Sequence, residues 1–174
     1  MKLYRFSPIK TQEELFQAIE YIHVQTHKLC KKNIGKYLTP TGSLAIFTHY
    51  PEEFEMLTTI RDSLTGEENY NKKYYKFLES VHFEATSEAP EATYRYLYIR
   101  HPDPYRSQVG DIDFVLPPEE HKKLQTRLES GESISGIRPS PEDHLELIEL
   151  YDPDVDVLSY LDTMTMEELI KKSA

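Results

Sequence analysis

Two aspartates separated by one residue, Asp111 and Asp113, have the type and spacing that most suggest chemistry in this sequence. They fall in the segment GDIDFVL, whose β-branched and aromatic residues favour a strand. On a strand, residues i and i+2 lie on one face about 7 Å apart. Two carboxylates at that spacing can converge on one hard cation or on a pair of metal ions. The sequence therefore predicts a Mg²⁺ site at these two aspartates.

The residues just ahead of the aspartates carry many ionisable and hydrogen-bonding groups. Arginine binds phosphate in a bidentate geometry, and hydroxyl groups can add further hydrogen bonds. The predicted phosphate and substrate contacts are Arg100, Tyr105, Arg106 and Ser107. His101 or Asp103 is the predicted catalytic group for proton transfer. These residues together predict a metal-assisted enzyme acting on a phosphorylated or nucleotide-like small molecule.

The string GDIDFVL resembles the strand motif of polymerase-type nucleotidyltransferases over Val109 to Leu116. The resemblance implies metal-dependent chemistry on a nucleotide-like substrate. In that family a Gly-Ser turn opens a helix ahead of the strand, whereas the residues here are HPDPYRSQ. The Gly-Ser element is missing, so the chain is not assigned to the family.

Two other interpretations of the same residues stay open. Asp111 and Asp113 could instead pair with Arg95, Arg100 or Arg106 on a partly solvated sheet face, as a purely structural feature. The protein could also be a sheet-face binder of small ligands without catalysis.

The charge distribution supports a different class of function. Residues 1–100 hold 13 Lys+Arg and 13 Asp+Glu, whereas residues 101–174 hold 7 and 17, which accounts for the whole net charge of −10. The alternative function is therefore a non-catalytic interaction or regulatory domain whose acidic C-terminal half binds a protein partner. The net negative charge disfavours nonspecific binding to duplex nucleic acid, because neutralisation of phosphates supplies that affinity.

The aspartate strand is expected to belong to a hairpin. Residues 93–100 and 111–116 both alternate in period two, and an antiparallel pairing would turn the Leu97 and Ile112 sides toward a core. Gly110 could supply a positive φ or a bulge just before the aspartates. The connection between the strands is longer than the commonest hairpin loops.

Capping signals and hydrophobic spacing predict the other elements. Helices are expected after Thr11 (up to Gly35), after Pro51, over ENYNKKYYKFLES, after Pro117 and after Thr165. Strands are expected over 2–9, 43–49 and 81–86, with a turn over 37–42 and an ambiguous segment over 145–151. This order predicts an α+β fold, a single globular domain over 1–174, with a mixed or mainly antiparallel sheet and a central hairpin (about 93–116) packed by several helices.

Two further groups of side chains are candidates for sites. Glu20, His23 and His27 share one helix face and could ligate a metal, although a solvated polar face is the simpler interpretation. Asp152, Asp154 and Asp156 fail the calcium-loop pattern. On a strand beside the hairpin they could form a second carboxylate row, although exposure to solvent is the favoured interpretation.

The tyrosines of the first hairpin strand, Tyr94, Tyr96 and Tyr98, could stack on bases or pack under a helix, and packing under a helix is favoured.

The length and composition fit an ordinary globular protein. A chain of 174 residues has the length of one domain, and one cysteine, Cys30, rules out an internal disulfide. No apolar run is long enough to span a membrane and no signal peptide is visible, so a cytoplasmic protein without membrane contact is expected.

Overall fold

Two capping boxes fix the helices that the sequence predicts best. The computed structural model describes residues 4–140 and 147–174. Helix α1 (Gln12–Ile34) begins at the Thr11–Glu14 capping box and ends at Gly35, whose φ is 85°. Helix α4 (Met166–Ser173) begins at the equivalent box of Thr165 and Glu168. Pro51 and Pro118 each open a helix, α2 (Pro51–Leu64) and α3 (Pro118–Glu129).

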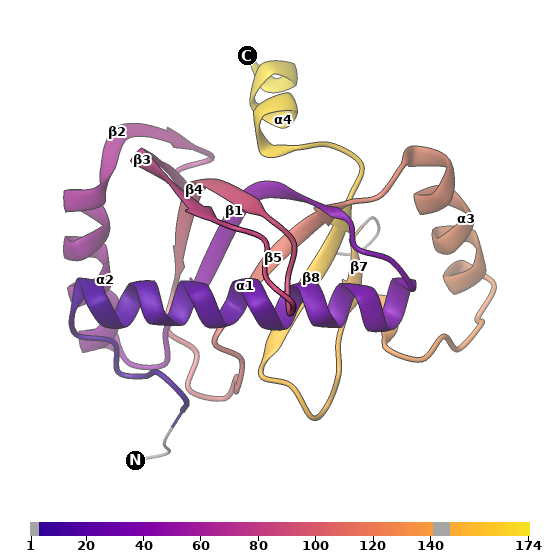
Figure 1. Ribbon diagram of the computed structural model, residues 1–174, viewed down its shortest axis with the longest axis horizontal. Helices are drawn as coiled ribbons and strands as arrows, with labels where there is room; N and C mark the ends of the chain where they lie inside the picture. Colours follow the sequence, from indigo (N-terminus) through magenta and orange to yellow (C-terminus); the bar gives the residue numbers. More distant parts are fainter. Residues whose placement is uncertain (1–3, 141–146) are drawn as a thin grey trace.

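The strands form one mixed sheet in the order β2-β3-β4-β1-β5-β8-β7-β6 (Figure 1). They are β1 (Thr39–Phe47), β2 (Thr65–Tyr70), β3 (Tyr74–Phe83), β4 (Ala92–Arg100), β5 (Gly110–Val115), β6 (Ile137–Pro139), β7 (Ile148–Leu150) and β8 (Val157–Asp162). Strand β1 pairs with β4 in parallel and with β5 antiparallel, and β5 pairs with β8 in parallel. The predicted α+β fold with a mixed sheet is therefore confirmed.

The predicted hairpin of 93–100 and 111–116 is wrong, because β1 lies between the two strands. Leu44 of β1 is opposite Leu97 of β4 on one side and Ile112 of β5 on the other. The connection over 101–109 is long enough to pass over the end of β1, where Asp103 N–H donates to the Thr48 carbonyl at 3.0 Å. The predicted orientation survives this change, since Leu97, Ile99, Ile112 and Phe114 all lie in the core.

A helix predicted over residues 68–80 is also wrong, since this segment forms the β2–β3 hairpin. Asn71 and Lys72 have φ values of 54° and 58°, the pair of positive angles that a tight hairpin turn of type I′ requires. Lys73 N–H donates to the Tyr70 carbonyl at 3.0 Å to close the turn. The helical spacing of the aromatic residues was misleading here because tyrosine suits a strand equally well.

The chain ahead of α1 was expected to be a strand and is not one over its described residues, 4–10. Conversely, the turn expected over 37–42 is largely strand, since β1 starts at Thr39. The ambiguous 145–151 segment contains β7, and its residues 145–146 lie outside the described part of the chain. Gly110 has neither a positive φ nor a bulge, but an added Cβ there would meet the Ala45 carbonyl oxygen and lie 2.6 Å from Ile22 Cδ1. A glycine is needed here mainly because the backbone of β1 approaches so closely, and the Ile22 side chain of α1 takes part of the same space.

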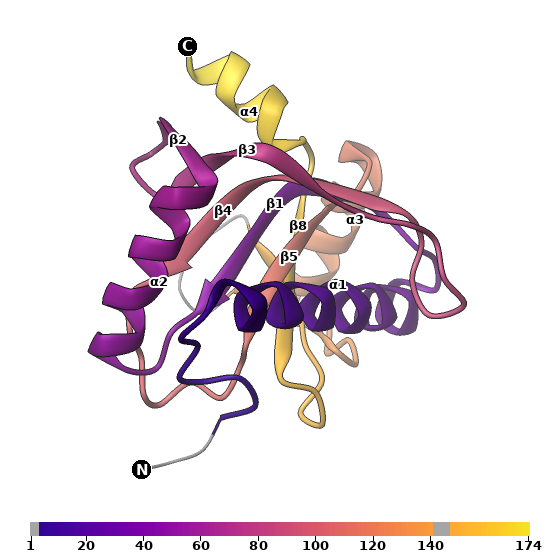
Figure 2. The same ribbon diagram turned by 60° about the vertical axis from the view of Figure 1, so that its left-hand side comes forward.

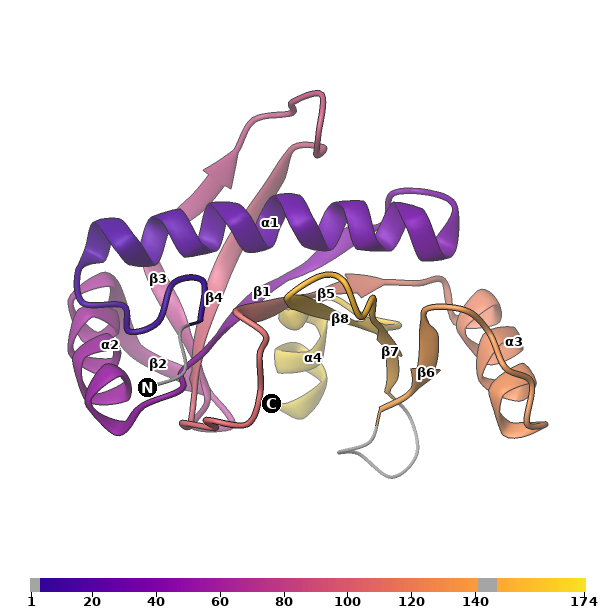
Figure 3. The same cartoon turned by 90° about the horizontal axis from the view of Figure 1, so that it is seen from below.

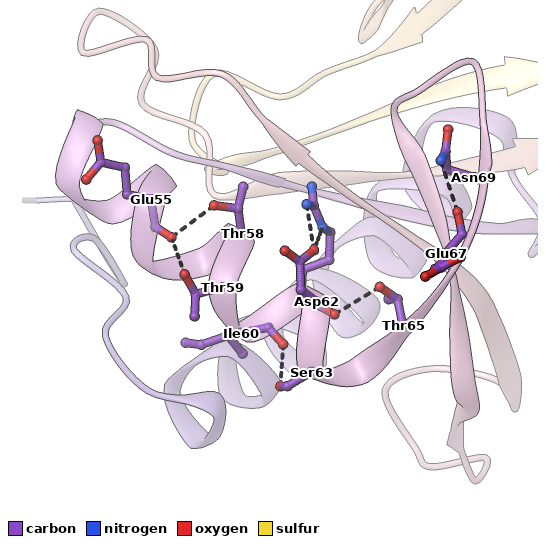
Figure 4. A network of polar contacts seen from close by, with 10 residues as sticks. Glu55, Thr58, Thr59, Ile60, Asp62, Ser63, Thr65, Glu67 and Asn69 are labelled. Carbon is purple, nitrogen blue, oxygen red and sulfur yellow. Dashed lines mark hydrogen bonds and ion pairs between the residues drawn. The ribbon is translucent and has the colours of Figure 1, made fainter.

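Helix α2 ends and β2 begins without a loop. Thr65, the first residue of β2, donates from its hydroxyl to the Arg61 carbonyl at 2.9 Å, and this bond closes the last turn of α2. Thr58 and Thr59 both donate to the Glu55 carbonyl on the same helix (Figure 4). Thr65 is therefore both the C-cap of α2 and the first residue of β2, and Gly66 follows it.

The two faces of the sheet differ in what covers them. Helix α1 lies across the strands on one face, and α4 lies on the opposite side of the sheet (Figure 3). The main core forms under α1 and includes Leu44, Ile46 and Phe114. On the other face a much smaller apolar cluster of Ala45, Phe47 and Leu158 lies beside Tyr98 and Tyr151. That face therefore has room for polar side chains.

No helix in the described residues has the length and apolar character that a membrane crossing needs.

Candidate functional site

Asp111 and Asp113 lie on the sheet face away from α1. Their neighbours on β5, Ile112 and Phe114, are buried in the core under that helix, so alternation sends both carboxylates to the opposite face. Both aspartates line one pocket of about 290 Å³. The other lining side chains include Lys73, Tyr74, Tyr98, Arg100 and Tyr160. The pocket therefore brings the predicted metal ligands together with one of the predicted phosphate ligands.

The pocket exists because a small residue separates larger ones. Ala45 of β1 is opposite Tyr98 of β4 on one side and opposite Asp111 of β5 on the other. Paired residues on adjacent strands point to the same face. A methyl group between a tyrosine and an aspartate fills little of that face, and the space above it is left to the longer side chains around it.

Burial dominates the electrostatics of the two aspartates. Asp111 is 8% exposed, and burial raises its pKa to about 7, although the charges of Arg100 and Arg106 act in the opposite direction. Burial also raises the pKa of Asp113 well above its usual range, and the charges of Asp111 and Asp162 raise it further. At neutral pH the pair is therefore prone to hold a proton or to bind a cation.

Asp113 has one carboxylate oxygen, Oδ1, that is buried and has no hydrogen-bond partner among the described residues. A buried carboxylate oxygen without a partner costs free energy, so it is uncommon in a folded protein. A backbone hydrogen bond from Tyr160 favours its charged form. Asp113 therefore has unused capacity to bind a ligand.

The aromatic walls of the pocket stay neutral. Burial raises the pKa of the Tyr74, Tyr98 and Tyr160 hydroxyls, so each keeps its proton at physiological pH. The rings of Tyr74 and Tyr98 have their centroids 5.3 Å apart. These phenols can donate hydrogen bonds to an anionic ligand while their rings keep water away from the carboxylates.

The loop over 101–109 lies outside this pocket. Tyr105 is 92% exposed, and Ser107 is also exposed. The exposed His101 ring stacks on Phe54 with centroids 4.7 Å apart, and Asp103 accepts a hydrogen bond from the Tyr105 N–H at 3.0 Å. Because β1 separates β4 from β5, the loop passes over the end of β1 and does not fold over the aspartates.

Arg106 holds an intermediate position. Its Nε lies 3.5 Å from Asp103 Oδ2, and its charge lowers the pKa of Asp111. It does not line the pocket. Of the predicted site residues, the pocket thus contains Arg100, Asp111 and Asp113, with Arg106 acting on it at longer range.

Sequence reasoning missed Lys73, Tyr74 and Tyr160 as site residues. Lys73 and Tyr74 were placed in a helix, whereas they follow the β2–β3 turn at the mouth of the pocket. The available signal was weak: Asn71 tolerates a positive φ, and the YYKF segment that follows suits a strand as well as a helix. Tyr160 is on β8, the neighbour of β5, and nothing local in the sequence reveals that adjacency.

The acidic row predicted over 152–156 does not form on a strand. Asp152 pairs with Lys32 at 2.5 Å and Asp156 with Arg5 at 2.8 Å, both ahead of β8. Asp156 also accepts a hydrogen bond from the Tyr21 hydroxyl. The acids that do act on the Asp111–Asp113 pair are Asp162 and Glu149, and Glu149 is paired with Arg138 at 2.5 Å.

The predicted solvated face of α1 is wrong for its histidines. His23 and His27 are 3% and 0% exposed, and His23 Nδ1 lies 2.8 Å from the hydroxyl of Tyr94, itself buried under α1. The favoured packing role of that tyrosine is therefore confirmed. Tyr98, by contrast, lies on the opposite face, and the β3–β4 register shifts between Lys76 and Val81. Within 4–140 and 147–174, no three His, Cys, Asp or Glu side chains cluster as a metal site.

A buried Ser–His contact was not expected from the sequence. Ser7 Oγ lies 2.5 Å from His49 Nδ1, and His49 Nε2 lies 3.1 Å from the Gln108 carbonyl oxygen. The Tyr4 ring stacks on His49 with centroids 3.7 Å apart. Glu53 accepts the backbone N–H groups of Ile9 and His49. With both ring nitrogens occupied and the ring covered, the cluster ties the segment before α1 to the 101–109 loop.

Comparison with known proteins informs the fold alone. No protein family model matches the chain, and no curated protein matches it. Among solved structures, the chain is similar to one titled "Structural Genomics, Protein EC4020", with a TM-score of 0.56 and 16% sequence identity. The similarity covers 100% of this chain and 99% of that one. It shows a shared fold.

Proposed function

We propose that the pocket at Asp111 and Asp113 is the active site of a metal-assisted enzyme that acts on a small phosphorylated or nucleotide-like substrate. The observation that carries the proposal is the buried, unpartnered Oδ1 of Asp113 beside a second buried carboxylate. A divalent cation would neutralise the pair and supply the missing partner.

Magnesium fits this donor set. Mg²⁺ is usually held by one or two carboxylates, with waters and substrate phosphates completing an octahedron. Two aspartates are therefore sufficient, and the lack of a cluster of three acidic or histidine ligands among the described residues is consistent with this type of site. Bound there, the ion would polarise a phosphoryl oxygen.

The positive side chains of the lining support a phosphate ligand. Arg100 offers a bidentate guanidinium and Lys73 a compact ammonium in the same pocket. At about 290 Å³ the pocket is at the small end of ligand sites, so it suits the phosphate-bearing end of a small molecule. Neutral tyrosines around it can donate to phosphate oxygens. His101 and Asp103 lie outside the lining, so the proposal assigns proton transfer to neither.

The first test is a thermal shift with Mg²⁺ or Mn²⁺ at pH 8. If the dissociation constant is about 1 mM, 10 mM metal adds about 1.4 kcal/mol, or roughly 3–6 °C in Tm for a chain of this size. Asp113→Asn should abolish the shift. Asp154→Asn, a change at an exposed aspartate, should leave it unchanged. A shift that is equal in Asp113→Asn, or none with either metal, would remove the metal from the proposal.

The second test adds the substrate group. Inorganic phosphate should raise Tm further when metal is present, and Arg100→Gln should reduce that increment while the response to metal alone persists. A panel of phosphomonoesters with Mg²⁺ then measures turnover. Phosphate binding that needs neither metal nor Arg100 would contradict the proposed site.

The alternative function is the binding of a protein partner by the acidic half, residues 101–174. Fewer of its acidic side chains are unpaired than the composition suggests. Four acids of residues 101–174 pair with basic residues of the first half: Glu120 with Lys36, Asp152 with Lys32, Asp156 with Arg5 and Glu167 with Arg95. Four of the 17 acidic residues of this half are therefore paired with the first half of the chain, although the net charge stays at −10.

A further inference from the structure

A second concave surface lies far from the aspartates, between α1 and β3. This α1–β3 groove has a volume of about 760 Å³. The first half of α1 forms one wall, the end of α2 closes part of it, and the other wall is the segment Phe77–Phe83 of β3. Its apolar residues include Phe16, Leu64, Leu78 and Val81, and Leu78 is 70% exposed.

The wall formed by β3 is an unpaired sheet edge. Strand β2 pairs with β3 only as far as Phe77, which is opposite Thr65. Beyond that point the ladders join β3 to β4 alone, through Val81, His82 and Phe83. In Figure 2, β3 and β4 continue together past the end of β2. The backbone groups of Leu78–Phe83 that point away from β4 therefore have no strand to bond among the described residues.

The groove also has a single sign of charge. Three exposed glutamates line it, Glu13 and Glu20 from α1 and Glu79 from β3. In the described part of the chain none of these carboxylates forms an ion pair, and no Lys or Arg is among the lining residues. The groove thus presents apolar side chains together with unpaired carboxylates from both α1 and β3, and it is complementary to a segment that carries both apolar and basic side chains.

We propose that the α1–β3 groove binds an extended, positively charged segment of a partner protein, which adds as a strand to the free edge of β3. Strand addition draws affinity from main-chain hydrogen bonds and specificity from alternate side chains. In this groove the apolar side chains of the segment would contact residues such as Phe16 and Val81, and its basic side chains would pair with the glutamates. A segment of about six residues covers this edge, whose regular part is Val81–Phe83 because the β3–β4 register shifts between Lys76 and Val81.

The test uses the full chain and a fluorescein-labelled peptide of three Lys-Val repeats, followed by fluorescence anisotropy. The peptide should bind in a salt-dependent manner, and a peptide of three Glu-Val repeats should not. Glu13→Lys and Glu79→Lys should each weaken binding by about fivefold or more. Glu55→Lys is the matched control, since Glu55 is an exposed helical glutamate on α2 outside the groove (Figure 4).

Hydrogen exchange locates the peptide. Binding should slow exchange of the amides in residues 78–83, and a peptide N-methylated at alternate residues should lose both affinity and protection. The proposal is overturned if the acidic peptide binds equally well, if the two groove variants bind like Glu55→Lys, or if neither peptide binds. It is also overturned if the same amides become protected without peptide as the chain dimerises, because a second copy would then be the occupant.

Discussion

Replacing Asp111 with asparagine should stabilise the protein at alkaline pH and lose that advantage in acid. The substitution keeps the shape of the side chain and removes a charge that is poorly tolerated in the pocket. Functional sites often hold such destabilising groups, because the same burial that raises a carboxyl pKa prepares it for a ligand.

The expected magnitude follows from the pKa of Asp111. Burial raises that pKa from 3.8 to about 7. The folded protein therefore binds the proton more tightly than the unfolded chain, so the free energy of unfolding falls as pH rises from about 4 to about 7 and is level above that. The fall amounts to about 4 kcal/mol at most for this carboxyl. Because the charges of Asp111 and Asp113 also act on each other, a difference of about 2 to 4 kcal/mol is expected.

The assay compares urea unfolding of wild type and Asp111→Asn at pH 4.5 and at pH 8. The variant should gain about 2 kcal/mol or more on wild type between the two conditions, and comparing the proteins at each pH cancels the titration of other groups. Asp154→Asn, at an exposed site, should show no such gain. If the variant is equally destabilised at both pH values, Asp111 is a satisfied ion-pair partner and the account of the pocket is mistaken.

Three further predictions concern the packing under α1. Gly110→Ala should lower the free energy of unfolding by about 3 kcal/mol, since its Cβ would collide with the backbone of β1, whereas Gly66→Ala, with 3.9 Å to its nearest atoms, should be nearly neutral by urea unfolding. Tyr94→Phe should cost about 1–3 kcal/mol, because it removes the hydroxyl 2.8 Å from His23 Nδ1; Tyr105→Phe, at a 92% exposed site, should change stability by less than about 0.5 kcal/mol. Burial lowers the pKa of His23 to about 4, so its imidazole should titrate near that value by NMR, and its contribution to stability should fall as pH drops from 6.5 toward 4; titration near 6.5 would contradict this.

Local signals predicted the elements that depend on local chemistry. The capping box at Thr11, the glycine at position 35 and the proline at position 51 determine helix ends through bonds within a few residues, and all three were placed correctly. The segment over 68–80 failed because its aromatic spacing fits a helix and a strand alike. The decisive feature, positive φ at Asn71 and Lys72, is a property of the turn that the two residue types only weakly signal.

The burial of polar residues was not predictable in the same way. Two histidines on α1 look like a solvated face until Phe83 and Phe114 of distant strands pack against them. Nothing in the sequence around Gly110 indicates that a side chain at this position would collide with the backbone of Ala45 and the side chain of Ile22. Each of these contacts joins residues far apart in the chain, so only the tertiary arrangement reveals them.

The insertion of β1 between β4 and β5, which the sequence did not predict, also shapes the candidate site. In a direct β4–β5 hairpin, Arg100 would lie beside the aspartates, roughly 5 Å away across one strand spacing, where ion pairs would tie both partners. Insertion of β1 puts two strand spacings, roughly 10 Å, between β4 and β5. It places Ala45 between Tyr98 and Asp111, while Arg100 is opposite Phe47, two residues further along β1. Arg100 and the two aspartates then line one pocket from strands on either side of β1, an arrangement that a ligand with both a cation and a phosphate would require.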